Sequence, residues 1–533
     1  MSIAIAVIVT IIIGYGPQRG YGLALSQDKK DKAPSSTSQI SVTLPSYYME
    51  NMVFQRDQPI VVKGTIKSVR GNKQINATKL SVALTQGGIS VSTGTEVASN
   101  GSFNCILKAQ QASLKPYSLQ IQYDGKTVAR LAKVYVGDVF VAAGQSNMEL
   151  NYAQHYKGNI FKNSNGLIKE GDLPKPLVDE NVKFVIADHN VEKTDFPLAA
   201  VNQKAGTWLN ASTTNSQYLS YLAQQFAMQL RAKHPKVPIG IIQTAWGGTP
   251  IRRHVSGGNI YANHIVPLKN FHVAGVLWYQ GCDDSIDYAT AAQYESQMTA
   301  LINQYRDVFG QANLPFLYVQ LARWSGYQYT QNVREAQRSA LGNANLHNTA
   351  NVGMTVSIDT DKGTSALIHP LGKDILGARI AAQYLAIENG TDVPSGPLIT
   401  SARHTANGAI VLSFQKNTAN GLKAMRPNYS KSAKAKSPSY ASNVQTTPLD
   451  GITDIATPTT EALQGFEVAN HSGRWTKVKA TINGSQVLLS ATDGSNLNDT
   501  TQVRYLFSGN PDSSSMLYNK LNLPASPFIV AIP

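Results

Sequence analysis

The feature that most constrains the fold is a change in the rhythm of hydrophobic residues along the chain. Between about residue 134 and residue 389, short apolar segments alternate with stretches in which apolar residues recur at helical spacing. Strands buried on both faces and connected by helices form a parallel sheet. The sequence therefore predicts an α/β domain with helices on both faces of a parallel sheet. Six segments have the strand pattern: 139–142, 182–186, 239–242, 273–278, 316–319 and 355–358.

Two helices of this domain are predicted from the spacing of apolar residues and from end signals. One ends at Gly310, which can adopt the left-handed conformation that stops a helix. The other is expected from about Lys373 to Ile387. The apolar positions of the first helix are Met298, Leu301, Ile302, Tyr305 and Phe309.

The segments on either side of this domain have the two-residue alternation of half-exposed strands. Runs such as 80–84 and 117–121 are separated by Gly, Asn and Asp turns, and the same rhythm returns after Pro394, as in 486–489. We expect β regions at 40–133 and 394–533, flanking an α/β domain at 134–393. The sequence leaves open whether the two β regions form separate domains or one shared sandwich.

The first 26 residues predict a signal peptide. The apolar run 3–13 is too short to span a bilayer, and the small residues Ala24 and Ser26 precede Gln27 as at a cleavage site. No Lys or Arg precedes the run, so a buried strand is the alternative. We expect residues 27–39 to be a linker and the protein to be secreted or periplasmic, with no membrane span in the mature chain.

Cysteine content and charge exclude several classes of protein. Two cysteines, Cys105 and Cys282, rule out a disulfide scaffold and a cysteine zinc cluster, and leave one optional bridge. The net charge of +14 raises the hypothesis of a nucleic-acid or polyanion binder. Much of the excess lies in Lys29, Lys30 and Lys32 and in the Ser/Pro-rich stretch 423–436, which is predicted to be a solvated loop. No recognition motif accompanies it, so no nucleic-acid partner is expected.

Polar residues follow the predicted strands at the points where these strands end, which is where open parallel sheets bind ligands. The first strand leads into 144–148, with Ser146 at a helix start, and the third into the paired glycines of 246–250. The fourth leads into the polar segment 279–284, and the last is followed by 368–370 with a histidine. A serine, glycine amides and a late histidine are the minimum parts of a serine esterase. Each is weak evidence alone, but their coincidence at one sheet edge carries the inference.

Several motifs resemble the sialate O-acetylesterase family, within the SGNH (GDSL) hydrolases. The first is Val136-Gly137-Asp138-Val139 leading into Gly144-Gln145-Ser146-Asn147-Met148, and the similarity extends from about Ser46 to Phe528. It implies an SGNH-type three-layer α/β/α domain with a parallel sheet, flanked by jelly-roll or immunoglobulin-like β-sandwich regions. The other similar segments are 51–57, 246–251, 278–281, 334–337 and 523–528.

The resemblance implies hydrolysis of acetyl esters on sugars, with Ser146 as nucleophile and His369 as general base, and it requires no metal or cofactor. The oxyanion would be held by the backbone N–H of Ser146, by that of Gly247 or Gly248, and by a side chain at Asp284. The partner would be an acetylated carbohydrate. Residues expected to contact it are Gln145, Trp246, Gln280 and Arg252.

The chain departs from the family pattern at the oxyanion residue and at the triad acid. Relatives usually have Asn where this chain has Asp284, and an ionised carboxylate there would repel the developing oxyanion. The usual acid position, three residues before His369, is Ala366. We take Asp359 as the candidate acid; Asp361, Asp283 or a Ser–His dyad are the alternatives.

Other interpretations of the same residues follow from these departures. Arg252 and Arg253 stand where an acidic residue is usual, and could favour a carboxylated sugar or simply face solvent. The substrate could also be acetylated xylan or xyloglucan. A catalytically impaired carbohydrate-binding protein is the alternative of another class, prompted by Cys282, Asp284 and Ala366.

Overall fold

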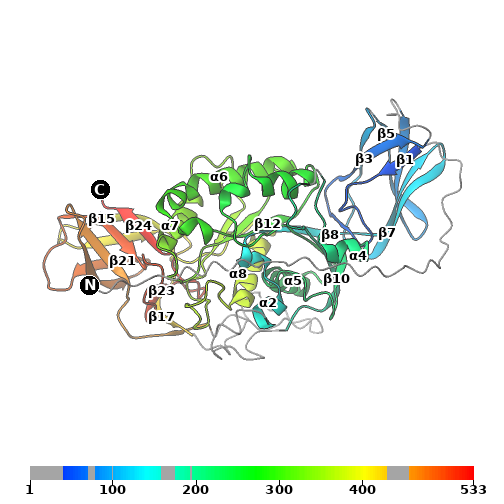
Figure 1. The fold of residues 1–533 in the computed structure, drawn as a ribbon. Coiled ribbons are helices and arrows are strands. Elements are labelled where there is room, and N and C mark those ends of the chain that lie inside the picture. The colour runs from blue at the N-terminus through cyan, green and yellow to red at the C-terminus, as the bar shows by residue number, and fades with distance from the viewer. Residues whose placement is uncertain (1–39, 70–77, 99, 158–174, 193–194, 429–454) are drawn as a thin grey trace. The chain divides into compact units, whose positions relative to one another are not determined.

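The structure is a computed structural model, and its described part comprises residues 40–69, 78–98, 100–157, 175–192, 195–428 and 455–533 (Figure 1). The predicted signal peptide and the linker before residue 40 lie outside the described residues. Gln39–Pro533 cluster as one unit, to which the following description applies.

A parallel sheet forms the centre of the α/β region. From β9 (Asp179–Ile186) the order runs through β11 (Ile239–Gln243), β8 (Lys126–Gly144), β12 (Gly275–Tyr279), β13 (Phe316–Val319) and β14 (Val352–Thr355), all parallel. The short β10 (Leu209–Ala211) adds an antiparallel edge to β9. Five of the six predicted strands are confirmed.

The sixth predicted strand, 355–358, is displaced, because β14 ends where the prediction began. Residues 352–358 are all buried, so the apolar run alone cannot mark the strand's limits. After Thr355 the chain turns, with the Thr360 N–H donating to the Ser357 carbonyl at 3.1 Å. The polar residues that come after this turn are buried as well.

Helices cover the two faces of the sheet in pairs (Figure 1). The helices α6 (Tyr288–Phe309) and α7 (Thr330–Ala340) lie on one face, and α5 (Tyr221–Lys233) and α8 (Lys373–Glu388) on the other. Both predicted helices are therefore confirmed. α6 ends at Gly310 in the left-handed conformation, and its five predicted apolar residues are buried. The described residues of this region also contain the short α-helices α1 (Ser146–Glu149), α2 (Tyr152–Lys157) and α4 (Ala200–Ala205).

Strand β8 continues from the N-terminal β region into the central sheet. Its first half pairs with β7 (Ser113–Tyr123), and its second half lies between β11 and β12. The expected boundary at residue 134 therefore falls inside one strand. At Val134 the side chains change from mostly exposed to mostly buried, which is the change of rhythm seen in the sequence.

The rest of the N-terminal β region is mostly antiparallel. β1 (Ile40–Thr43), β3 (Ile60–Ser68) and β6 (Ser102–Leu107) form one sheet, while β4 (Thr78–Gln86) pairs with β5 (Ile89–Ala98) and β7. β2 (Val53–Gln55) lies parallel to β8. Cys105 of β6 and Cys282 are both buried free thiols, so the optional disulfide is not formed.

The C-terminal β region has its own sheets. A seven-stranded sheet has the order β15 (Ile399–His404), β16 (Ile410–Phe414), β21 (Gln486–Ala491), β20 (Trp475–Asn483), β19 (Phe466–Asn470), β22 (Thr500–Tyr505) and β24 (Phe528–Ala531). A three-stranded sheet contains β18 (Ala456–Pro458), β17 (Lys423–Pro427) and β23 (Met516–Tyr518).

The expectation of a solvated loop at 423–436 is wrong for its first residues, because Lys423 and Arg426 lie in β17. Met425 and Pro427 of this strand are buried, so Arg426 between them is an outward position of a strand. Arg426 forms an exposed ion pair with Glu461. Residues 431–436 lie outside the described part.

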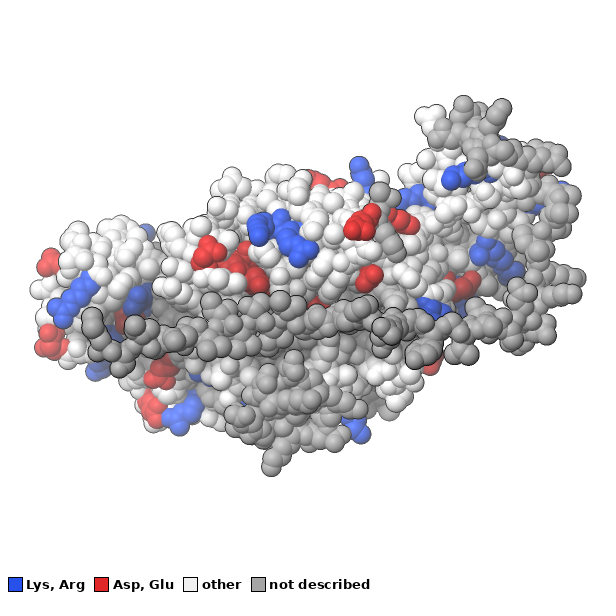
Figure 2. Space-filling view, viewed as in Figure 1, with Lys and Arg blue, Asp and Glu red and all other residues white. Residues whose placement is uncertain are grey.

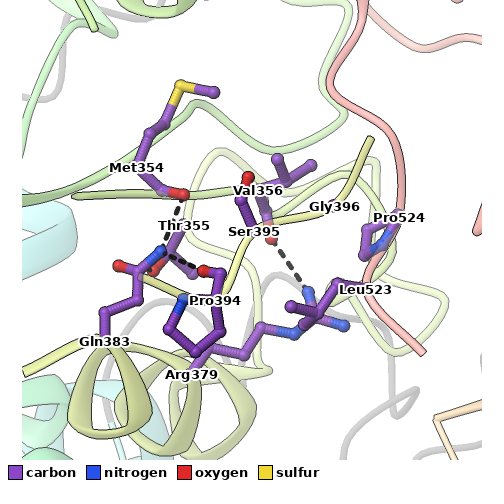
Figure 3. Close-up of a pocket in the computed structure, with 10 residues that line it drawn as sticks. All are labelled: Met354, Thr355, Val356, Arg379, Gln383, Pro394, Ser395, Gly396, Leu523 and Pro524. Carbon is purple, nitrogen blue, oxygen red and sulfur yellow. Dashed lines mark hydrogen bonds between the residues drawn. The ribbon is translucent and has the colours of Figure 1, made fainter. Parts of the chain in front are cut away.

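The C-terminal region begins against α8 and β14 (Figure 3). Gln383 of α8 donates to the carbonyls of Met354 and Pro394, both at 3.0 Å, and Arg379 donates to the Val356 carbonyl at 2.9 Å. These groups line a small cavity together with Leu523 and Pro524 from the far end of the chain. The start of the C-terminal region at Pro394 is therefore hydrogen-bonded to the helix that follows His369.

Two surface properties bear on the partner classes. None of the helices in the described part of the chain is long and apolar enough to cross a membrane. On the face drawn in Figure 2, the acidic and basic side chains of the described residues are interspersed. The described residues of this face form no single-sign track of the kind that binds a nucleic-acid backbone.

Candidate active site

The structure brings Ser146 and His369 together at the carboxyl edge of the sheet. The Oγ of Ser146, the first residue of α1, lies 2.8 Å from Nε2 of His369 in the loop between β14 and α8. Gly144 makes the turn from β8 possible: its φ is +128°, and a Cβ there would lie 2.3 Å from the Tyr279 carbonyl oxygen. The contact joins residues that are 223 positions apart.

The environment of His369 keeps its imidazole neutral. Burial lowers the pKa of His369 to about 3, and the nearby Lys373 cation acts in the same direction. A neutral ring whose Nε2 faces a serine hydroxyl can accept that hydroxyl's proton. The pair therefore has the geometry of a nucleophile and its base.

The structure does not bring the predicted acid, Asp359, to His369. Asp359 forms two hydrogen bonds to the buried guanidinium of Arg379, at 2.8 and 2.7 Å, and accepts a third from the Tyr518 hydroxyl at 3.0 Å. Its carboxylate balances a buried cation, which is the physical reason it is not available to the histidine.

The two other candidate acids are also bonded elsewhere. Asp361 pairs with Arg323 at 2.8 Å, and Asp283 accepts from Gln145 Nε2 at 2.6 Å. Among the residues that the structure describes, His369 has no carboxylate partner. The geometry therefore corresponds to a Ser–His dyad.

One of the two glycine amides expected in the oxyanion hole is already occupied. The Gly247 N–H donates to Glu149 Oε2 at 2.5 Å, and the other oxygen of Glu149 lies 2.8 Å from His189 Nε2. Within the described residues, the N–H groups of Ser146 and Gly248 donate to no protein group. Gly248 is exposed with φ +67°, so its amide is accessible.

Asp284, which stands at the expected oxyanion side chain, is buried and bonded. Both carboxylate oxygens accept from the Ile251 N–H, at 3.2 and 3.0 Å, and one accepts from Gln280 Nε2. Burial raises the pKa of Asp284 to about 6. Gln280, an expected substrate contact, also donates to the Thr249 carbonyl at 3.0 Å and accepts from Tyr294. These two side chains connect the loops after β11 and β12.

Gln145, another expected substrate contact, is committed to the loop after β12. Its side-chain oxygen accepts from the N–H groups of Gly281 and Cys282, both at 2.9 Å, and its amide nitrogen binds Asp283. Only 1% of Gln145 is exposed. Its polar atoms therefore connect the turn after β8 to the loop after β12.

Trp246 and Arg252 are the expected substrate contacts that reach the surface. Arg252 is exposed and Trp246 is half-buried. The Trp246 ring stacks on the His189 ring with centroids 4.4 Å apart, and the Arg253 guanidinium lies 4.4 Å from the Trp246 centroid. This aromatic and cationic group borders the Gly247–Glu149 contact.

Sequence reasoning missed four residues beside the pair: Asn147, Glu149, His189 and Lys373. His189 follows β9 at its carboxyl end, so the strand-end rule that pointed to the other loops also applied there. Glu149 lies three positions after Ser146, and Lys373 lies four positions after His369. Across the described residues, no group of three or more His, Cys, Asp or Glu side chains has the arrangement of a metal site.

The known proteins that this chain resembles are named as esterases that act on carbohydrates. Residues 136–386 match the family model described as carbohydrate esterase, sialic acid-specific acetylesterase. Sialate O-acetylesterase from Homo sapiens is 27% identical over 315 residues, a match covering 50% of this chain and 57% of that protein. A probable carbohydrate esterase from Arabidopsis thaliana is 27% identical over 210 residues, 37% of this chain and 74% of the relative. The chain thus spans little more than half the length of the human relative.

A solved structure extends the similarity to the flanking regions. A carbohydrate acetylesterase from Xanthomonas citri is 28% identical, with a TM-score of 0.69, and the superposition covers 92% of this chain and 99% of that one. The chain therefore has the mixed α/β fold of a carbohydrate esterase, with its β regions included. Its α/β region, residues 136–386, is similar to the sialic acid-specific acetylesterases among the carbohydrate esterases.

Proposed function

We propose that this protein is a carbohydrate O-acetylesterase of the SGNH type, with a three-layer α/β/α catalytic region, that uses Ser146 as nucleophile and His369 as base. The observation that carries the proposal is the 2.8 Å contact between Ser146 Oγ and the neutral His369 ring, at the carboxyl edge of a parallel sheet. The similarity of residues 136–386 to an acetylesterase family supports it.

The first half of the reaction forms an acetyl-enzyme. Ser146 Oγ attacks the acetyl carbonyl carbon while its proton passes to His369 Nε2. The carbonyl oxygen becomes an oxyanion, which the unoccupied N–H groups of Ser146 and Gly248 can stabilise. The bond from carbon to the sugar oxygen then breaks, and His369 returns the proton to that oxygen so that the sugar leaves as an alcohol.

The second half releases acetate. A water molecule gives a proton to His369 and attacks the acetyl carbon, and the bond to Ser146 Oγ breaks as the proton returns to the serine. In a dyad no carboxylate stabilises the transient imidazolium. Its counter-charge during each step is the oxyanion itself.

Two relatives support an acetylated carbohydrate as substrate. The human relative is named sialate O-acetylesterase, and the Xanthomonas citri structure, which covers nearly the whole chain, is titled a carbohydrate acetylesterase. The exposed Arg252 and the half-buried Trp246 provide a surface where a sugar can contact the site. We propose acetylated sugars as the class, with sialic acid its first member to test.

The test compares the wild type with Ser146→Ala on p-nitrophenyl acetate. Loss of the nucleophile should lower kcat by about a thousandfold or more. Ser296→Ala, on the exposed side of α6, is the matched control and should keep the wild-type rate. Equal rates in wild type and Ser146→Ala would exclude the proposed function. Acetate release from acetylated sialic acid, xylan and xyloglucan then ranks the substrates.

We also propose that the protein is exported. The apolar run at 3–13 and the small residues before Gln27 support cleavage after Ser26. Expression with a cell-fractionation step and N-terminal sequencing of the product tests this. An intact leader on cytoplasmic protein would refute it.

A further inference from the structure

Asn147 connects the two residues of the dyad. It follows Ser146 directly, and its amide nitrogen donates to the Ile368 carbonyl at 3.1 Å, one residue before His369. The same nitrogen lies 3.6 Å from the Cys282 sulfur. Asn147 is 2% exposed, so water does not compete for these bonds. One side chain thus joins the turn that carries the nucleophile to the loop that carries the base.

Lys373 fixes which way the Asn147 amide points. Its ammonium donates to Asn147 Oδ1. While Lys373 is protonated, its ammonium can only donate and a carbonyl oxygen can only accept, so the Asn147 oxygen then faces Lys373 and its nitrogen faces Ile368. The bond to the histidine loop is therefore present only in the orientation that Lys373 selects.

Lys373 is an unusual residue for this position because it is fully buried without a counter-ion. In the described part of the chain no carboxylate pairs with it, and its Nζ lies 4.4 Å from the centre of the Tyr279 ring. Burial lowers the pKa of Lys373 to about 7. The neighbouring buried lysine, Lys362, pairs with Asp374 at 3.1 Å in the ordinary way. An unpaired buried cation is costly, and such groups concentrate at functional sites.

We propose that Asn147, held in one orientation by Lys373, positions His369 against Ser146 and so replaces the positioning role of a triad carboxylate. The inference rests on the proposed function, since it concerns the same two catalytic residues. Asn147 and Lys373 act through the backbone of Ile368, so they are positioning residues. Their effect should appear in kcat, because substrate binding does not require the serine and histidine to be aligned.

The first test is Asn147→Asp in the full chain, assayed on p-nitrophenyl acetate. The aspartate keeps the size of the side chain and forms an ion pair with Lys373, which favours folding, but it cannot donate to the Ile368 carbonyl. We expect kcat to fall by about 10- to 100-fold, with KM within about twofold of wild type. The matched control is Asn519→Asp, another buried asparagine that donates to two carbonyls, in the C-terminal region. It should leave kcat within about threefold of wild type.

A double-mutant cycle tests whether Lys373 acts through Asn147. Lys373→Met removes the donor and keeps the length of the side chain. Its effect on the charge of His369 is the same whether or not Asn147 is present, so that contribution cancels in the cycle. We expect the effect of Lys373→Met on kcat to differ by about threefold or more between the wild-type and Asn147→Ala backgrounds. Equal effects in both backgrounds would overturn the role of Lys373.

A covalent probe separates failure of this proposal from failure of the proposed function. With a fluorophosphonate, Ser146 Oγ bonds to phosphorus, fluoride leaves, and the serine proton passes to His369. Mass spectrometry of wild type should show one label on Ser146, and Asn147→Asp should label about tenfold more slowly or worse. Fast labelling and turnover in Asn147→Asp would overturn the positioning role and leave the function intact. A wild type that neither labels nor hydrolyses would overturn both.

Discussion

Replacing Asp359 by asparagine separates a structural carboxylate from a catalytic one. Asp359 is completely buried and holds the guanidinium of Arg379, whose side chain is 4% exposed, through two hydrogen bonds. The Tyr518 hydroxyl from β23 donates to the same carboxylate at 3.0 Å. The asparagine side chain would keep the shape but remove the charge, and its NH₂ group would meet the guanidinium.

The expected cost follows from that geometry. Breaking a buried ion pair by removing one partner costs about 3–5 kcal/mol, because the remaining charge is left without compensation. For a cooperative unit as large as Gln39–Pro533, with an unfolding entropy of about 2.1 cal/mol/K per residue, this corresponds to a fall in Tm of roughly 3–5 °C. A triad acid behaves differently: its replacement by the amide lowers kcat about 10⁴-fold while the fold is unchanged. We therefore expect a large loss of stability, and a kcat within about threefold of wild type at about 25 °C.

Thermal unfolding followed by circular dichroism gives the stability, and p-nitrophenyl acetate hydrolysis at room temperature gives kcat. Glu467→Gln is the control, because it removes a carboxylate from a partly exposed ion pair with Arg504 and should cost no more than about 1 kcal/mol. The double variant Asp359→Leu/Arg379→Met removes both charges and should recover part of the stability. A thousandfold loss of kcat with an unchanged Tm would refute the reasoning and make Asp359 the triad acid.

Three further predictions concern the turn, the histidines and the substrate. Gly144→Ala places a Cβ 2.3 Å from the Tyr279 carbonyl oxygen at φ +128°, so kcat or the yield of folded protein should fall by about tenfold or more. Burial lowers the pKa of His254 to about 3, so below about pH 6.5 only the unfolded state gains that proton, and the free energy of unfolding falls as the pH is lowered. In urea titrations the free energy of unfolding of His254→Asn should fall by about 2 kcal/mol less than that of wild type between about pH 6.5 and 5, and parallel curves would contradict this. Trp246→Ala should raise KM for acetylated sugars about fivefold and leave that for p-nitrophenyl acetate unchanged; equal shifts on both substrates would remove Trp246 from the sugar site.

Much of the fold could be predicted because its signals are local. The buried strands 139–142 and 316–319 and the helix ending at Gly310 are read from side-chain periodicity and a single turn residue, which depend on neighbours only a few positions away. Strand limits could not be placed where burial continued past the strand, as at Thr355. The division at residue 134 marked a change of environment, and the structure shows that β8 crosses it without a break.

The candidate site divides in the same way. That Ser146, the glycine pair and His369 each follow a strand is a property of the sequence, and the rule for parallel sheets places such residues at one edge. The sequence does not determine which atoms these residues contact. Gly247 donates to Glu149 and Gln280 binds Asp284, and nothing in the local sequence specifies either contact.

The sequence by itself determined the order of elements and the positions where chemistry could occur, because hydrophobic periodicity and turn residues act over a few neighbours. Only the tertiary structure decided the partners. It pairs Asp359 with Arg379, because each buried charge binds the group that compensates it in space. Among the described residues, His369 therefore contacts Ser146 and has no carboxylate partner. The tertiary structure also places Lys373 beside Asn147, across 226 positions of chain, where no local pattern indicates a connection.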